Sequence, residues 1–110
     1  MRTVLRSNEF DMFYASLSHK VQQKIDYAVN VIANIKVVNN KLVKKLVNTD
    51  FYELRISVGD EYRVIIFTVD NESFIEANTI FLLNGFMKKS TKDYKKEIER
   101  ACEIIKRFEI

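Results

Sequence analysis

Apolar residues recur every three or four positions through the first third of the chain, which is the period of one buried helical face. Either Ser7 or Asn8 can serve as the N-cap before this stripe, and Ser18 offers a second cap inside it. One helix of about 28 residues would be long for a domain of this size. We therefore expect a helical hairpin, preceded by a short edge strand over residues 2–6, although the spacing alone fits one helix as well. The stripe consists of Phe10, Phe13, Leu17, Val21, Ile25, Ala28, Ile32 and Ile35.

The period changes to two near residue 51, which is typical of strands with one buried face. Residues 51–58 and 61–69 form two such segments, separated by the turn signal Gly59–Asp60. A polar turn then leads to a third expected strand over residues 74–83, with a weak middle that suits a bulge or a bend. Residues 41–47, before the first strand, are compatible with a short helical turn or an extended connector.

Residue parity in the first hairpin predicts how its side chains divide between the two faces of the sheet. Directly paired residues of an antiparallel ladder share a face, and the apolar residues of both strands stand at even positions. Paired numbers must then sum to an even number, which requires a three-residue or bulged connection. Arg55 and Arg63, at odd positions, are expected together on the opposite face. The even set comprises Tyr52, Leu54, Ile56, Val58, Tyr62, Val64 and Ile66.

The end of the chain combines a third apolar run with a second helical pattern. The apolar run stops at Gly85, where we expect the strand to end, and the following segment Phe86–Lys89 places two lysines before a helix start. Ser90–Asp93 supply a cap and an acid for that helix, and we expect Cys102 beside its buried stripe. The stripe is Tyr94, Ile98, Ala101, Ile105 and Phe108. Together these patterns predict one α+β domain over residues 1–110.

Composition narrows the class of protein without assigning a function. The chain has 110 residues, 47% hydrophobic and 30% charged, which is typical of one globular domain. No apolar run reaches the roughly 18 residues that a membrane span needs, and the first residues lack a signal-peptide pattern, so we expect a cytoplasmic protein. One cysteine excludes an internal disulfide and a thiolate metal cluster. The only histidine, His19, is expected at the surface, and we expect neither a metal nor a cofactor.

The net charge of +3 is modest, so the distribution of the charges matters more than their sum. No acid occurs between Tyr27 and Thr49, a stretch that contains four lysines. A second basic cluster follows the last apolar run. The two clusters are Lys36, Lys41, Lys44 and Lys45, and then Lys88, Lys89, Lys92, Lys95 and Lys96.

Strands and strand ends carry the residues that best suit a site for phosphate. Arg55 and Arg63 share a predicted face, and cations at Lys88 and Lys89 oppose the dipole of the helix that follows, which weakly indicates an anionic ligand. Each residue also has a purely structural explanation. The arginines can pair with nearby glutamates, Glu53 and Glu61, the lysines can lie in solvent, and Tyr94 has the spacing of a core residue.

The chain resembles the RelE/HigB toxins of bacterial type II toxin–antitoxin pairs, and among them the phage-derived HigB-like branch. The matching segments, in the family's order, are Tyr52–Arg55, Tyr62–Val64, Ile80–Lys89 and Glu97–Ala101, with Lys44–Leu46 before them. This resemblance implies a helical hairpin on a small, mainly antiparallel twisted sheet, followed by a C-terminal helix. It also implies a metal-independent endoribonuclease that cuts mRNA on the ribosome, in which the RNA 2′-hydroxyl attacks the neighbouring phosphate.

The resemblance assigns roles to residues of this chain. Arg63 matches the strand arginine that holds the scissile phosphate, and Lys88 or Lys89 matches the basic residue that stabilises the transition state or donates a proton. Tyr94 stands where some members carry a tyrosine that acts as a base or stacks on a nucleobase. Arg55 corresponds to a scaffold or backbone-binding arginine. The chain departs from the family pattern in having Glu53, and no histidine, near the first hairpin strand.

Further residues are implied in RNA binding, namely Lys44, Lys45, Phe86 and Lys92, with Phe86 packed under the site. The partners that the resemblance implies are mRNA, the ribosome and a cognate antitoxin, usually a helix-turn-helix protein in the HigB-like branch. The alternative is a noncatalytic module on the same fold that binds RNA or a protein.

Overall fold

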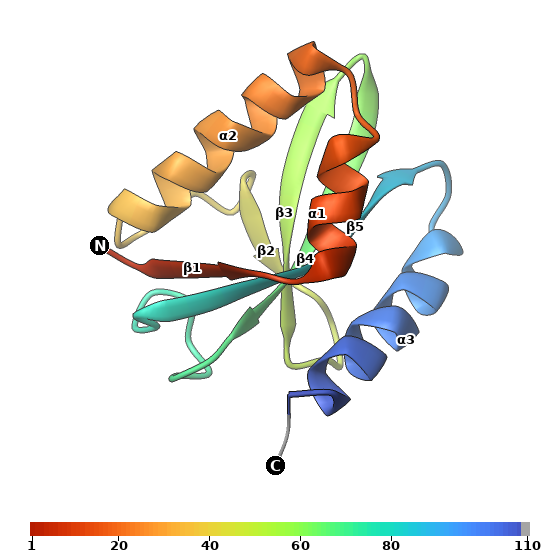
Figure 1. Cartoon of the computed structure of the whole chain (residues 1–110). Coiled ribbons are helices and arrows are strands. Elements are labelled where there is room, and N and C mark those ends of the chain that lie inside the picture. The colour runs from red at the N-terminus through yellow and green to blue at the C-terminus, as the bar shows by residue number, and fades with distance from the viewer. Residues whose placement is uncertain (109–110) are drawn as a thin grey trace.

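The computed structural model of the chain describes residues 1–108, which form a five-stranded sheet flanked by helices (Figure 1). In chain order the elements are β1 (Thr3–Arg6), α1 (Asn8–Ala15), α2 (His19–Asn34), β2 (Val43–Lys45), β3 (Phe51–Val58), β4 (Asp60–Thr68), β5 (Thr79–Lys88) and α3 (Asp93–Lys106). The strand order is β1-β5-β4-β3-β2, with β1 parallel to β5 and the other neighbours antiparallel. The predicted α+β fold with a mainly antiparallel sheet is confirmed.

The N-terminal helices form the predicted hairpin, and two serines determine where each helix begins. The side chain of Ser7 accepts a hydrogen bond from the backbone N–H of Phe10, and that of Ser18 accepts one from Val21. Such side-chain bonds satisfy N–H groups that have no partner within the helix. The break after Ala15 lets α1 and α2 lie at different angles on the same face of the sheet (Figure 1).

Two cores lie on opposite faces of the sheet. The face covered by α1 and α2 buries even-numbered residues of β3 and β4, including Leu54, Ile56, Val64 and Ile66, as the parity predicted. The other face is not simply polar, because α3 packs against a second apolar set there. That set is Leu46, Phe51, Ile65, Phe81, Leu83, Phe86, Ala101 and Ile104. The polar residues of the candidate site lie on the α3 face, beside this second core.

The β3–β4 connection has the predicted odd length. Val58 pairs with Asp60 across the ladder, and Gly59 at the tip adopts a φ of 72°, a conformation that glycine accommodates without steric cost. The same register pairs Arg55 directly with Arg63. The prediction that these two arginines share one face is therefore confirmed.

The third strand does not start where the sequence predicted it. Residues 74–78 form a loop, and β5 runs from Thr79 through Gly85 to Lys88, so the expectation of a strand over 74–83 that ends at Gly85 is wrong. The cause is Arg2, whose buried guanidinium donates hydrogen bonds to the loop carbonyls of Phe74, Ile75 and Ala77. Those carbonyls are therefore not available to a strand ladder.

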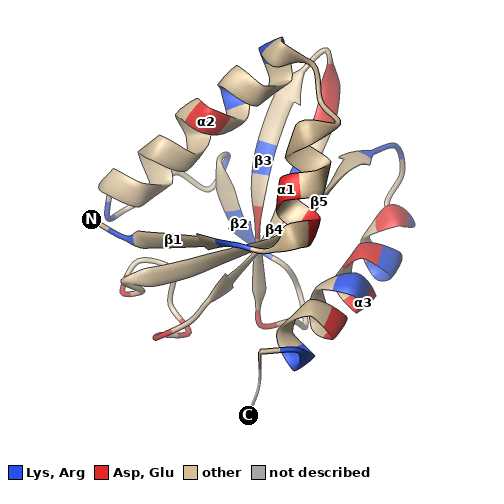
Figure 2. Cartoon of the chain, viewed as in Figure 1, with Lys and Arg blue, Asp and Glu red and all other residues tan. Residues whose placement is uncertain are grey.

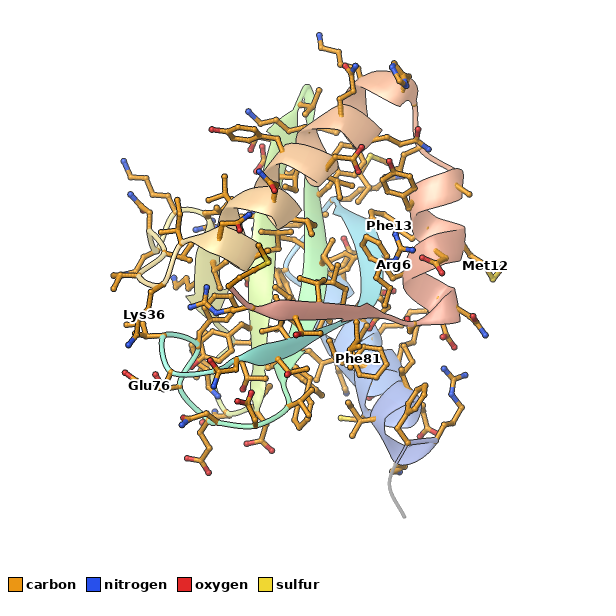
Figure 3. The ribbon with its side chains drawn as sticks, turned by 60° about the vertical axis from the view of Figure 1, so that its left-hand side comes forward. Arg6, Met12, Phe13, Lys36, Glu76 and Phe81 are labelled. Atoms are coloured by element: carbon orange, nitrogen blue, oxygen red, sulfur yellow. The ribbon has the colours of Figure 1, made fainter. Side chains whose placement is uncertain are left out.

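Gly85 lies inside β5, and the ring of Phe13 packs where a side chain at this position would be. Phe13 is labelled in Figure 3. A Cβ at this position would overlap the Phe13 ring atoms, so the glycine allows α1 to approach the sheet closely. Helix α3 begins at Asp93, the last residue of the segment Ser90–Asp93 in which the sequence predicted the helix start. The loop over residues 74–78 is also linked to the segment after α2. The Nζ of Lys36 lies 3.9 Å from a carboxylate oxygen of Glu76, and both side chains are labelled in Figure 3.

Three smaller features of the fold concern the connector before β3, the cysteine and the length of the helices. Residues 43–45 of the predicted connector form the edge strand β2. Cys102 is exposed rather than buried, and Ile104 takes the core position on α3 instead. Within residues 1–108, the helices are too short or too polar to cross a lipid bilayer.

A β-bulge interrupts the pairing of β4 with β5. Ile66 pairs with Leu82 and Val64 pairs with Gly85, so that Leu83 and Asn84 both stand opposite Ile65. An extra residue in one strand reverses the facing of every residue beyond it. Beyond the bulge, Phe86 and Lys88 therefore share the α3 face with their partners Arg63 and Glu61. The sequence suggested a bulge only near residues 76–79.

Candidate functional site

Four polar side chains on the α3 face meet at one carboxylate oxygen. The Glu53 Oε1 lies 3.0 Å from the Nε of Arg63 and 3.5 Å from the Nε of Arg55. Tyr94, in the first turn of α3, donates its hydroxyl to the same oxygen at 2.9 Å and accepts a hydrogen bond from the Nε of Arg63 at 3.1 Å. Strands β3 and β4 therefore supply three members of the cluster, and α3 supplies the fourth.

Arg63 is the most enclosed member of the cluster, with 3% of its side chain exposed. Its Nη1 contacts the Oε1 of Glu61 at 3.3 Å and donates to the carbonyl of Tyr62 at 2.9 Å. Burial opposes its charge, but the bonds to Tyr94 and Glu61 and the charge of Glu53 outweigh burial and raise the pKa of Arg63. The guanidinium is thus charged and is held within the protein through its Nε and Nη1. The structural alternative, pairing with both glutamates, is what the structure contains.

Tyr94 connects the buried cluster to the surface. Burial raises the pKa of its phenol; the hydrogen bond from Arg63 opposes this shift, and Glu53 adds to it. The ring packs edge-on against Phe86, with centroids 5.5 Å apart, and the Nζ of Lys88 lies 5.5 Å from the ring centroid. A phenol with a raised pKa keeps its proton at neutral pH. Tyr94 is therefore suited to donate a proton, whereas a role as a base is disfavoured.

A groove of about 320 Å³ opens beside the cluster, between α3 and the β2–β3 hairpin. Four cations from three strands line it, namely Lys44, Lys45, Arg55 and Lys88, and Glu53 is the one acid among its described lining residues. Figure 2 shows the basic stretches of β2, β3 and the end of β5 from which these side chains come. The opposite wall is apolar and consists of Leu46, Val47 and Ile98. The groove therefore offers positive charge next to an apolar surface.

Several predicted residues lie outside the groove or only at its edge. Lys45 is among the lining residues, but its Nζ is 5.1 Å from the centroid of the Tyr52 ring, which belongs to the α2 face. Phe86 is buried beneath Tyr94, as expected for a packing role. Lys89 and Lys92 are exposed in the β5–α3 connection and are not among the described lining residues. Lys88, rather than Lys89, is thus the lysine that the fold brings to the groove.

Glu53 and Glu61 are the members of the site that the sequence analysis did not place in it. Both had been named only as ordinary partners of the arginines. Their odd numbers on β3 and β4 were the signal that could have assigned them to the same face as Arg55 and Arg63. Across the ladder, Glu53 also pairs with Lys44. The acids are thus interleaved with the bases on one face.

Two other kinds of site, one built on histidine and one built on a metal ion, depend on the positions of their possible ligands. His19 stands exposed at the first residue of α2. Among residues 1–108, no three side chains of histidine, cysteine, aspartate or glutamate are grouped closely enough to hold a metal ion.

The sequence profile of the family described as Phage derived protein Gp49-like (DUF891) matches residues 12–106. The chain belongs to this family. A search of curated protein sequences gave no match. The Gp49-like family agrees with the phage-derived branch that the sequence resembled.

Solved structures give the fold of this Gp49-like protein. A chain of the intact E. coli RelBE toxin–antitoxin complex matches with a TM-score of 0.63 at 12% identity, over 82% of this chain and 100% of that chain. A substituted E. coli RelE toxin in the free state matches with a TM-score of 0.62 at 16% identity, over 90% and 96% of the two chains. The RelB–RelE complex of Methanococcus jannaschii matches with a TM-score of 0.57 at 24% identity, over 82% and 96%. The Gp49-like protein therefore has the RelE fold.

Proposed function

We propose that this protein is the toxin of a type II toxin–antitoxin pair and that it cuts mRNA on the ribosome without a metal ion. The observation that carries the proposal is the groove in which Lys44, Arg55 and Lys88 lie beside Tyr94. Membership of the Gp49-like family and the RelE fold support the same conclusion.

The reaction needs positive charge where the phosphate gains negative charge. The 2′ oxygen of the RNA forms a bond to phosphorus, the bond to the 5′ oxygen breaks, and a cyclic phosphate remains on the upstream fragment. Arg55 can hold two phosphate oxygens at once, and Lys88 supplies a compact charge from the end of β5. Preorganised charges of this kind stabilise the pentacovalent transition state. Lys44 extends the cationic wall along the RNA backbone.

Two protons must also move, and the groove contains one donor and one acceptor for them. Glu53 accepts the proton of the attacking 2′-hydroxyl, and Tyr94 donates its proton to the departing 5′ oxygen. Because the Tyr94 hydroxyl lies 2.9 Å from the Glu53 Oε1, the proton gained by Glu53 can return to Tyr94 afterwards. This assignment follows from the raised pKa of Tyr94, which favours the protonated phenol.

Arg63 has a different role from the one that the family resemblance implied. The Nε and Nη1 of its guanidinium are occupied by Glu53, Glu61 and Tyr94, so a phosphate can bind these two atoms only if one of those side chains moves. We assign Arg63 to holding Glu53 and Tyr94 in place. Direct contact between Arg63 and the scissile phosphate stays a prediction.

The proposed inhibitor is a cognate antitoxin that covers the cationic groove. Two of the structural relatives were solved as toxin–antitoxin complexes, which supports a protein partner of this kind. We further propose a helix-turn-helix antitoxin, as in the HigB-like branch. Co-expression of the neighbouring small gene should restore growth if that gene encodes the antitoxin.

The decisive test incubates the purified protein with ribosomes and a defined mRNA and maps new 5′ ends. Lys88→Ala and Lys89→Ala form a matched pair, because the lysines are adjacent but only Lys88 lines the groove. We expect Lys88→Ala to lower kcat/KM by about 10²-fold, the magnitude typical for loss of one preorganised charge. Lys89→Ala should stay close to wild type, and both variants should remain folded.

Two outcomes would contradict the proposal. Salt-sensitive RNA binding without new 5′ ends would favour the noncatalytic module instead of the nuclease. If Lys89→Ala were inactive while Lys88→Ala retained full activity, the groove would not be the active site.

A further inference from the structure

The bulge in β5 determines which face its last residues occupy. Beyond the bulge, Phe86 pairs with Arg63 and Lys88 pairs with Glu61, and paired residues share a face. If the pairing of Leu82 with Ile66 continued without the extra residue, Gly85 would pair with Arg63 instead. Phe86 and Lys88 would then face α1 and α2, away from the groove. The position of Lys88 in the groove thus depends on the bulge.

Side chains from two other elements hold this bulge. On one side, the Ser7 hydroxyl donates to the backbone carbonyl of Leu83 while it caps α1. On the other side, the Nδ2 of Asn84 donates to the backbone carbonyl of Glu97 at 3.0 Å and to its Oε1 at 3.1 Å. Asn84 is 1% exposed and Glu97 is 7% exposed. The bulge is therefore tied directly to α3.

The amide of Asn84 is only half satisfied. Its Oδ1 is buried and has no hydrogen-bond partner among the residues that the structure describes. A buried polar atom without a partner is destabilising relative to an apolar one. Burial alone would thus favour an apolar side chain here. The contribution specific to asparagine is its donation to Glu97.

We propose that Asn84 is a positioning residue that fixes α3 against the bulge and so places Tyr94 over Phe86 and Lys88. Glu97 lies one helical turn after Tyr94, so a bond at Glu97 determines both the height and the rotation of the tyrosine. One amide then aligns the two halves of the site, because the bulge turns Lys88 into the groove and α3 brings Tyr94 there. The catalytic consequence rests on the proposed function, whereas the geometric consequence does not.

The test uses isosteric substitutions at the two partners. Asn84→Asp places two carboxyl groups against each other, and Glu97→Gln alone keeps an acceptor for Asn84. The double variant Asn84→Asp/Glu97→Gln restores a donor and an acceptor between the two side chains with the order exchanged, but it leaves a carboxylate at position 84 facing the backbone carbonyl of residue 97. Asn84→Leu, which removes the donor without adding charge, serves as a second variant if the aspartate prevents folding.

The first readout is the titration of Tyr94, followed by NMR with ring-labelled tyrosine in the intact protein. In the wild type, Tyr94 should titrate above the ordinary tyrosine pKa of about 10. Asn84→Asp and Asn84→Leu should move the titration of Tyr94 toward that ordinary value. Glu97→Gln should leave the titration of Tyr94 unchanged, and the double variant should restore it in part.

The second readout is cleavage on the ribosome. A misplacement of about 1 Å typically costs up to 10²-fold in rate, so we expect kcat to fall by about 10- to 100-fold in Asn84→Asp. KM should be unchanged, because Lys44 and Arg55 lie on strands that the pair does not touch. Rescue of kcat by the double variant would support the positioning role.

An unshifted Tyr94 titration in folded Asn84→Asp or Asn84→Leu would overturn the inference, as would a double variant in which the titration is shifted as far as in Asn84→Asp alone. Inactivity of the wild-type protein on ribosomes would overturn the proposed function instead. The Tyr94 titration would still decide whether Asn84 positions the helix.

Discussion

Replacing Tyr94 by phenylalanine tests the site with the loss of a single oxygen. The hydroxyl bridges Glu53 and Arg63, so Tyr94→Phe removes two hydrogen bonds to charged groups. The ring contacts with Phe86 and Lys88 remain. Any effect of the substitution therefore reports on the hydroxyl rather than on the packing of α3.

The expected loss of stability follows from what remains after the substitution. A hydrogen bond to a charged group is worth about 1.5–3 kcal/mol, but Arg63 and Glu53 still pair with each other at 3.0 Å. We therefore expect a net cost of about 1–2 kcal/mol. For a domain of this size, each kcal/mol lowers Tm by about 4–8 °C. Because proton donation typically contributes 10²- to 10⁴-fold, kcat should fall by at least about 10²-fold.

Calorimetry and cleavage of ribosome-bound mRNA measure the two effects separately. Tyr27→Phe is the matched control, because Tyr27 is largely exposed and should change neither quantity. The raised pKa of Tyr94 stabilises the fold below the ordinary tyrosine pKa of about 10, and this contribution is lost as the pH rises through the folded pKa. Wild-type activity in Tyr94→Phe would refute the proton-donor role, and an unchanged Tm would refute the bridging role of the hydroxyl.

Three further predictions concern the scaffold. Arg2→Met should lower the free energy of unfolding in urea by at least about 3 kcal/mol, because it leaves several buried carbonyls without a donor. Gly85→Ala should cost about 1–3 kcal/mol by overlap with Phe13; Phe13→Ala in the same chain should relieve that overlap, and purely additive costs would contradict this. The backbone N–H groups of Thr79 and Asn78 lower the pKa of Asp70. The ionised carboxylate therefore stabilises the fold above its unfolded pKa of about 4, and this stabilisation is lost as the pH falls through the pKa of Asp70 in the folded state. Acid unfolding of Asp70→Asn should lack that component.

Local patterns predicted most of the fold because each of its signals depends on neighbouring residues. The helical hairpin follows from the apolar stripe and the cap at Ser18, and both are visible within one or two turns of sequence. The shared face of Arg55 and Arg63 follows from parity within a single hairpin. Neither conclusion needs knowledge of distant contacts.

The start and the facing of β5 could not be predicted because distant residues determine them. Arg2, at the other end of the chain, binds the carbonyls that keep residues 74–78 out of the sheet. The bulge is held by Ser7 and by Glu97 on α3. A period-two pattern carries no signal for contacts at such a separation. For the same reason, the resemblance left open whether Lys88 or Lys89 serves the site, since the bulge determines which lysine enters the groove.

The arrangement of charges separates the site into two parts with different duties. The buried part, in which Arg55 and Arg63 pair with Glu53 and with the more exposed Glu61, is close to electrical balance and gains its rigidity from hydrogen bonds. The groove part carries Lys44 and Lys88, which are more accessible and add positive charge where RNA would lie. Exposed charges act mainly on association and are screened by salt, whereas buried ones resist screening and determine geometry. Substitutions in the buried part should therefore change kcat and stability together, while substitution of Lys44 should act on substrate affinity and leave the fold intact.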